Sequence, residues 1–263
     1  MKRFLKDFKK YWGYAIYAAR SELKAEVASS YLNWIWWILE PLCFMLIYTF
    51  IFGFVFNASE QYFPVFVYIG LTVWEFFNKS VHASVKLVKN NKSIVSKVYM
   101  PKFVLAEAKM MVYGFKTLIS FGIVVLLMIV FRVPITFNIL YTIPLIAALI
   151  LFTFGCMCIL LHFGVYILDL SNIINIVLKL VFYMTGIFYS IESRIGGAYP
   201  KLATLLGKCN PLAFIVSSLR SCVIYSEGVN LLVLAIWLVL SFAICAIGIR
   251  TIYKNENSYV KVI

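Results

Sequence analysis

Charged residues, and acidic ones above all, are scarce in this sequence. Only 13% of its 263 residues are charged, and 11 Asp or Glu stand against 24 Lys or Arg. The two histidines and six cysteines show neither a metal-ligand spacing nor an acid/base partner close by in the sequence. The phosphate-binding pattern Gly-x-x-x-x-Gly-Lys-Ser/Thr is absent as well. We therefore expect no catalytic centre, no metal site and no ATP site in this chain.

Apolar residues are correspondingly abundant. They make up 63% of the chain, with a mean hydropathy of +0.93, against about 45–50% in soluble domains. A helix needs about 20 apolar residues to cross the hydrocarbon layer. The sequence predicts an all-α integral membrane protein whose transmembrane domain covers residues 34–263. Its six predicted spans are residues 34–56, 63–85, 110–131, 139–168, 173–190 and 231–249.

The positive residues predict how these spans are oriented. Residues 1–33, 86–109 and 250–263 carry seven, six and three Lys or Arg, whereas the loops predicted on the other side carry five, among them Arg220. Lys and Arg in short loops remain on the cytoplasmic side of a membrane. Both termini and the basic segment 86–109 are therefore expected in the cytoplasm. This pattern favours contact with membrane lipids over binding of nucleic acid.

Two segments outside the spans have a pattern of their own. In residues 1–33, Phe4, Phe8, Tyr11 and Trp12 recur at helical spacing among lysines, which is typical of an amphipathic helix on a membrane surface. Residues 191–228 hold two short apolar pieces separated by glycine and proline, and predict re-entrant helices in the outer leaflet. Cys209 and Cys222 both fall in this outer region, where a disulfide is an open alternative.

The basic segment contains a short helix of its own. Asn90 or Asn91 is expected to cap it, Ile94, Val95 and Val98 form a small apolar face, and Pro101 ends it. A helix of this kind fits the groove of a partner protein.

Aromatic and charged residues within the spans are the remaining candidates. Glu40 and Asp169 are expected to be isolated acids, whereas the other charged groups are expected to face protein or water, or to reach an interface: Glu75, Lys79, Lys116 and Lys179. Two aromatic groups lie in the first and fifth spans, namely Tyr48, Phe52 and Phe56, and Tyr183, Phe188 and Tyr189. Such rings can stack on sugars, and they can equally face lipid or pack internally.

Three stretches carry a resemblance to a known family. The first is Arg20-Ser21-Glu22-Leu23-Lys24 with Ser30-Tyr31-Leu32, Trp36 and Leu39-Glu40-Pro41-Leu42. The second is Gly70-Leu71 with Trp74, Asn91 and the run from Ile94 to Pro101, and the third is Asn210-Pro211-Leu212 with Arg220. Their order resembles the membrane subunit of ABC-2 type polysaccharide exporters, the permeases of O-antigen, capsule and teichoic acid.

The resemblance implies a mechanism and assigns residues to it. Two copies of the chain would form a pore for a lipid-linked polysaccharide in a bacterial cytoplasmic membrane, and two separate ATP-binding subunits would hold ATP and Mg²⁺. The coupling contacts would be Asn91, Ile94, Val95, Lys97, Val98, Tyr99 and Pro101. The cytoplasmic entrance would involve Phe4, Phe8, Tyr11, Trp12, Arg20, Glu22 and Lys24. The six aromatics named above would line the channel.

Three other functions remain open from the sequence. An ABC-2 exporter of lipids or drugs would share the membrane topology, although such relatives often carry a large outer domain or a fused ATPase. A membrane-embedded glycolipid transferase would need a cluster of carboxylates or histidines, which the sequence lacks. A structural partner in a larger channel complex would not require an ATP-binding subunit.

Overall fold

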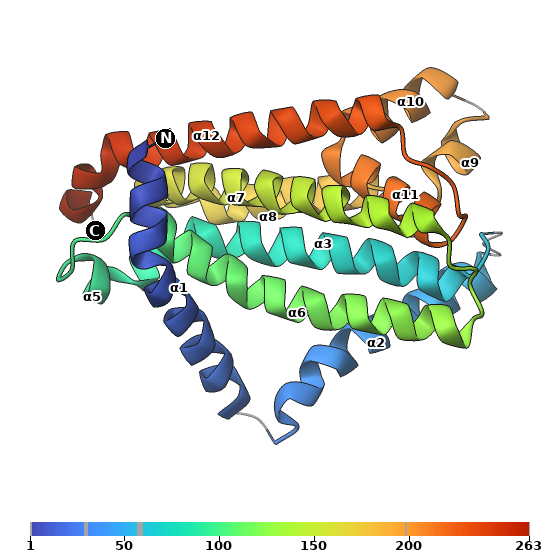
Figure 1. Ribbon diagram of the computed structural model, residues 1–263, viewed down its shortest axis with the longest axis horizontal. Helices are drawn as coiled ribbons and strands as arrows, with labels where there is room; N and C mark the ends of the chain where they lie inside the picture. The colour runs from blue at the N-terminus through green and yellow to red at the C-terminus, as the bar shows by residue number, and fades with distance from the viewer. Residues whose placement is uncertain (1, 29–30, 57–59, 198, 263) are drawn as a thin grey trace.

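The computed structural model describes residues 2–28, 31–56, 60–197 and 199–262, and every regular element within them is helical (Figure 1). The long helices are α1 (Lys2–Ala28), α2 (Trp36–Tyr48), α3 (Phe63–Val85), α6 (Phe103–Val130), α7 (Thr142–Tyr166), α8 (Leu170–Met184) and α12 (Leu231–Val262). The short helices are α4 (Leu87–Asn90), α5 (Lys92–Val95), α9 (Ile191–Ile195), α10 (Pro200–Cys209) and α11 (Pro211–Val223). A π-helix, Thr49–Val55, continues α2, and 3-10 turns at Asn33–Ile35 and Phe137–Tyr141 precede α2 and α7.

The predicted all-α class is confirmed, and the apolar lengths show a multi-pass membrane protein. Among the described residues, four helical stretches are long and apolar enough to cross a bilayer: Trp36–Val55, Phe103–Val130, Phe137–Tyr166 and Leu231–Glu256. The pair α10 and α11 would make a fifth, but it is bent by 94°. Helix α8 is apolar but has only 15 residues.

Helix α3 occupies the middle of the bundle, with α6 on one side and α7 and α8 on the other (Figure 1). Nearly every residue from Phe63 to Phe77 is buried. The second half of α3 carries Glu75, Lys79 and His82, so the helix is less apolar than its neighbours. Because other helices surround it, α3 does not need an apolar surface on every side.

Small residues bring α7 and α12 together. A Cβ atom added at Gly155 of α7 would lie 2.7 Å from the backbone nitrogen of Cys245 on α12, and one added at Gly248 would lie 2.8 Å from the carbonyl oxygen of Gly155. Glycines at a crossing allow two backbones to approach closely, which is how helices associate inside membranes. The crossing fixes α12 against the bundle.

Helix boundaries differ from the predicted spans at three places. Helix α6 begins at Phe103 rather than near residue 110, because residues 103–108 are buried at one end of the bundle. Helix α12 continues to Val262 rather than ending near 249, and it buries Ile252 and Tyr259. Helix α8 ends at Met184, and the chain then turns at Gly186, whose φ of 67° favours glycine.

Two parts of the sequence-based analysis fall outside the described residues. Ser30 of the first family stretch is one, and residues 57–59, between the first two predicted spans, are the other. Helix α1 covers most of residues 1–33, and α9, α10 and α11 lie between residues 191 and 228.

Candidate functional site

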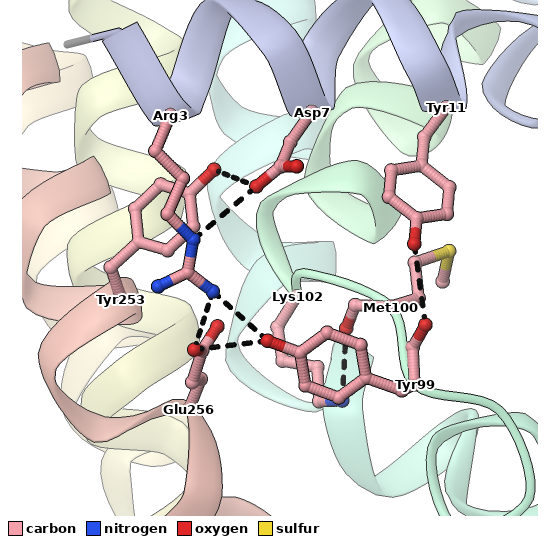
Figure 2. A network of polar contacts seen from close by, with 8 residues as sticks. All are labelled: Arg3, Asp7, Tyr11, Tyr99, Met100, Lys102, Tyr253 and Glu256. Carbon is pink, nitrogen blue, oxygen red and sulfur yellow. Dashed lines mark hydrogen bonds and ion pairs between the residues drawn. The ribbon is translucent and has the colours of Figure 1, made fainter.

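Three segments far apart in the sequence meet at one end of the bundle: the start of α1, the segment after α5, and the last turns of α12 (Figure 2). Arg3 is the centre of the contact. Its Nη2 atom lies 2.7 Å from Oε1 of Glu256 and donates to the hydroxyl of Tyr99 at 2.9 Å. Tyr99 in turn donates to Glu256 at 3.1 Å. The hydrogen bond to Glu256 raises the pKa of Arg3, so the guanidinium stays charged.

Asp7 and Tyr253 extend this network along α1 and α12. The Tyr253 hydroxyl donates to Oδ2 of Asp7 at 2.8 Å, and the Arg3 guanidinium lies 4.5 Å from the centre of the Tyr253 ring. Beneath these polar contacts, Phe103 packs against Phe4 with ring centres 5.0 Å apart. The end of the bundle is thus held by apolar packing with a charged network above it. We call Arg3, Asp7, Tyr99, Tyr253 and Glu256 the terminal network.

The predicted coupling residues lie beside the terminal network, and their exposure divides them. Ile94, Val98 and Tyr99 are exposed by 37%, 54% and 63%. Val95, at 5%, points into the protein and packs among residues of α6, α7 and α12. A partner would therefore find Ile94, Val98 and the Tyr99 ring at the surface, while Val95 holds the short helix in place.

The polar members of the predicted coupling segment also have different roles. The Asn91 amide donates to the carbonyl of Leu87 at 2.8 Å and so closes the end of α4, whereas no side-chain hydrogen bond caps α5. The expected cap of the short helix is therefore not formed. Lys97 is exposed, and Pro101 is buried at the start of the turn into α6. Burial lowers the pKa of Lys102, whose ammonium donates to the Met100 carbonyl at 3.0 Å.

The predicted entrance residues form two groups along α1. Phe4, Phe8 and Tyr11 are half-buried against the bundle, and the Tyr11 hydroxyl donates to the Tyr99 carbonyl at 3.4 Å. Trp12 is exposed.

Further along α1, Arg20 and Lys24 are exposed as well, whereas Glu22 forms an ion pair with Lys109 of α6. One face of α1 binds the bundle and the other presents positive and aromatic side chains. This arrangement suits a helix at a membrane surface.

Ion pairs within the bundle connect α1, α2, α3 and α6. Lys116 of α6 contacts Glu26 of α1 at 2.6 Å. Lys79 of α3 lies 3.1 Å from Glu75 and 3.6 Å from Glu40 of α2. The expectation that Glu40 is isolated is therefore wrong, because the fold brings α2 against α3. These pairs lower the cost of placing charge inside the bundle.

The two predicted aromatic groups come together. Phe188 lies 4.4 Å from Tyr48 and 4.6 Å from Phe52 between ring centres, and the Phe52 and Phe188 rings are nearly parallel. Phe188 is buried, but Tyr183 and Phe56 are exposed. The Tyr189 hydroxyl donates to the Tyr183 carbonyl at 2.8 Å, which stabilises the turn after α8. One aromatic cluster thus joins the π-helix to this turn.

Arg220 is not the loop charge that the sequence suggested. It lies on α11 with 4% exposure, and its guanidinium donates to the carbonyls of Phe66 at 3.1 Å, Gly186 at 2.8 Å and Ile187 at 2.6 Å. Its Cζ atom is 3.4 Å from the centre of the Phe66 ring. Gly70 permits this approach, since an added Cβ would lie 2.6 Å from Nη2. Arg220 therefore fastens α11 to α3 and to the turn after α8.

The disulfide left open for Cys209 and Cys222 is not formed. Both cysteines are free, and Cys209 is exposed whereas Cys222 is buried. The other four cysteines are free as well: Cys43, Cys156, Cys158 and Cys245. Helices α10 and α11 are held by packing, and α11 also by the hydrogen bonds of Arg220.

Sequence reasoning missed the terminal network. Arg3 and Glu256 are separated by 253 residues, and Asp7 and Tyr253 by 246. Neither pair belongs to a periodic pattern or to a motif in the sequence, so each contact is visible only in the folded structure. The acids Asp7 and Glu256 within otherwise basic segments were the one available hint.

Neutralising Glu256 should loosen α1 without unfolding the bundle. Glu256→Gln removes the charge that binds Arg3 and weakens the acceptor for Tyr99, at a cost of about 1 kcal/mol for a partly exposed pair. Amide hydrogen exchange in residues 2–28 should accelerate roughly fivefold. Asp169→Asn, at the exposed start of α8, is the control and should leave this exchange unchanged. Equal protection of α1 in both variants would contradict the role given to Glu256.

Fold and site define a helical multi-pass membrane protein in which an amphipathic N-terminal helix and a short surface helix share one basic end. No family model matches the sequence. An O-antigen export system permease protein, RfbA, of Klebsiella pneumoniae is 26% identical over 244 residues, which cover 92% of each chain. Another RfbA from the same organism is 29% identical over 76% of this chain and 75% of its own. The polysialic acid transport protein KpsM of Escherichia coli is 27% identical over 82% of this chain and 84% of its own. These relatives confirm the resemblance to the permeases of polysaccharide exporters.

Proposed function

We propose that the chain is the permease subunit of an ATP-driven exporter that moves a lipid-linked cell-envelope polysaccharide across the bacterial cytoplasmic membrane. The similarity to O-antigen export permeases carries this proposal, because it extends over 92% of the chain. ATP and Mg²⁺ would be bound by a separate subunit, and this chain would contribute no cofactor site of its own.

Six crossings with both termini in the cytoplasm are the topology that we propose. The four long apolar stretches supply four of them, and α3 and α8 supply the others. Helix α3 is buried among its neighbours. Helix α8 is followed by a buried turn, and this turn lengthens the segment that would cross the membrane. The terminal network supports the orientation, since both ends of the chain and the basic segment lie at the same end of the bundle (Figures 1 and 2).

The surface formed by Ile94, Val98 and Tyr99 is proposed as the contact with the ATP-binding subunits. It is apolar at its centre and has the exposed Lys97 beside it, which is the composition of a helix-in-groove contact. Tyr99 also forms hydrogen bonds with Arg3 and Glu256. A movement of this surface, caused by the ATP-binding subunits, would therefore be transmitted directly to α1 and α12. A second copy of the chain would complete the pore.

Aromatics of the cluster around Phe188 are proposed to lie along the substrate path. Tyr183 and Phe56 expose their rings, and the faces of such rings stack on sugars. The exposed side of α1, with Trp12 and Arg20, is proposed to meet the head group of the lipid-linked substrate.

Deletion of the gene in its host tests the proposal. Surface polysaccharide should disappear, and its lipid-linked precursor should accumulate inside the cell, because synthesis continues without export. The intact gene should restore export, whereas a copy lacking the residues of α1 should not. Normal surface polysaccharide in the deletion strain would refute the proposed function.

A further inference from the structure

A polar cavity lies at the end of the bundle opposite the terminal network. In Figure 1, α9 and α10 are at one end, while α5 and both chain termini are at the other. The cavity has a volume of about 560 Å³ and is enclosed by α10, α11, the turn after α8 and the segment that leads into α12. In the proposed topology it opens on the outer side of the membrane.

Tyrosine and carboxylate groups shape one wall of this cavity. Glu60 accepts hydrogen bonds from Ser193 at 2.9 Å and from Tyr225 at 3.1 Å, so its carboxylate is held in place. Burial, together with the charge of Glu60, raises the pKa of Tyr225 to about 12. Tyr225 therefore keeps its proton at neutral pH and donates it to Glu60, and Tyr189 lines the cavity as well.

Helix α11 adds hydroxyl groups to the lining of the cavity. Ser217 and Ser218 both line the cavity. Ser217 donates to the Phe214 carbonyl at 3.1 Å and its oxygen can still accept, and Ser218 is buried. The Arg220 guanidinium also lines the cavity, and three of its five N–H donors are bonded to backbone carbonyls. The cavity therefore offers a ligand hydroxyl groups, aromatic rings and carboxylates, with Lys208 as a cation in its lining.

Charge on the walls selects the class of ligand. Three carboxylates line the cavity, those of Glu60, Glu192 and Glu227, against two cations, Lys208 and the mostly hydrogen-bonded Arg220. A ligand with a carboxylate or phosphate would meet more negative than available positive charge, and would lose its hydration without a partner. A neutral ligand rich in hydroxyl groups would find donors and acceptors for its own.

We propose that this cavity is a binding site for neutral sugar units on the outer side of the membrane. The inference rests on the proposed function, because an exported polysaccharide emerges at this end. A volume of about 560 Å³ lies in the range of small-ligand sites and accommodates a short saccharide segment. The tyrosine rings would contact sugar C–H groups, and Ser217, Ser218 and Glu60 would bind sugar hydroxyls.

The chain offers a matched pair of variants to test this site. Gly207 lines the cavity, and an added Cβ would meet no atom within 4 Å. Gly207→Leu should therefore fill the cavity without disturbing its walls. Gly197 has the same free space but does not line the cavity, so Gly197→Leu is the control. Ser217→Leu, on α11, fills the same space from the other side and guards against a folding defect in the first variant.

Binding is measured by saturation-transfer NMR on the full chain in phosphatidylcholine nanodiscs, which avoids sugar-containing detergents. The probes are lactose and 3′-sialyllactose, which differ by one acidic sugar. Lactose should bind the unmodified protein and Gly197→Leu with millimolar affinity, and both filling variants at least about tenfold more weakly. Sialyllactose should also bind at least about tenfold more weakly than lactose, because of the carboxylates.

Three outcomes would overturn the proposal. They are no lactose binding to the unmodified protein, equal binding to Gly207→Leu and Gly197→Leu, or equal binding of the two sugars. Displacement of lactose by phosphoethanolamine would instead assign the cavity to a lipid head group. The surface polysaccharide of the deletion strain is scored separately, so loss of export combined with absent lactose binding would refute this site and leave the proposed function standing.

Discussion

Replacing Ile94 and Val98 together by aspartate should abolish co-purification of the ATP-binding subunits with this chain. Both side chains are exposed on the proposed docking surface, so the change places two charges where an apolar contact is expected. Burying unpaired carboxylates should cost at least about 3 kcal/mol, which is more than a hundredfold in affinity. Affinity purification of the tagged permease, with the ATP-binding subunit detected by immunoblot, measures the loss.

The choice of residues keeps this experiment separate from folding. Val95 belongs to the same predicted apolar face but is buried, so a charge there would disturb the bundle itself. Ile135→Asp is the matched control, because Ile135 is equally aliphatic and exposed but lies in the connection at the other end of α6. An intact complex with the Ile94 and Val98 variant would remove the docking surface from the proposed mechanism.

Replacing Arg220 by methionine should cause the largest loss of stability among single substitutions in α9, α10 and α11. The change leaves the carbonyls of Gly186 and Ile187 without their hydrogen-bond donor in a buried turn, and removes the cation over the Phe66 ring. We expect a loss of about 2–4 kcal/mol. Thermal unfolding, followed by size-exclusion chromatography after heating, would show it as a lower midpoint.

Gly70→Ala tests the same contact from the other side. The added Cβ would lie 2.6 Å from Nη2 of Arg220 and 3.3 Å from the Ile187 carbonyl oxygen, so the guanidinium must move. Because both substitutions act on one interaction, the double variant should lose clearly less than the sum of the single losses. Gly122→Ala, on α6 with free space around it, should be neutral or slightly stabilising. Fully additive losses would show that Gly70 and Arg220 do not act together.

Much of the bundle could be predicted from the sequence because it follows from local composition. The apolar runs gave α2, α7 and α12 near their observed starts, and the aromatic spacing gave the amphipathic α1. Prolines and glycines marked the broken helices between residues 191 and 228. Each of these features depends only on residues that are close together in the sequence, so the sequence alone is enough to predict it.

Other expectations failed where a residue's environment comes from distant parts of the chain. Arg220 was counted with the loops because the apolar stretch around it is short, yet α3 and the turn at Gly186 enclose it. The sequence predicts that Glu40 is isolated, but α2 packs against α3 and so brings Glu40 next to Lys79. Helix α6 begins earlier in the sequence than predicted, because α1 and α12 cover its first turns. No local sequence pattern predicts this contact between the three helices.

The sequence by itself determined that the chain is a helical membrane protein with its positive charge on one side, because burial in lipid and retention of Lys and Arg depend on local hydropathy and charge. Only the tertiary structure decided that Arg3 meets Glu256, that Val95 faces inward and that Arg220 lines a cavity at the opposite end of the bundle. Those outcomes depend on which helix faces pack together, and that packing is a property of the whole bundle rather than of any segment.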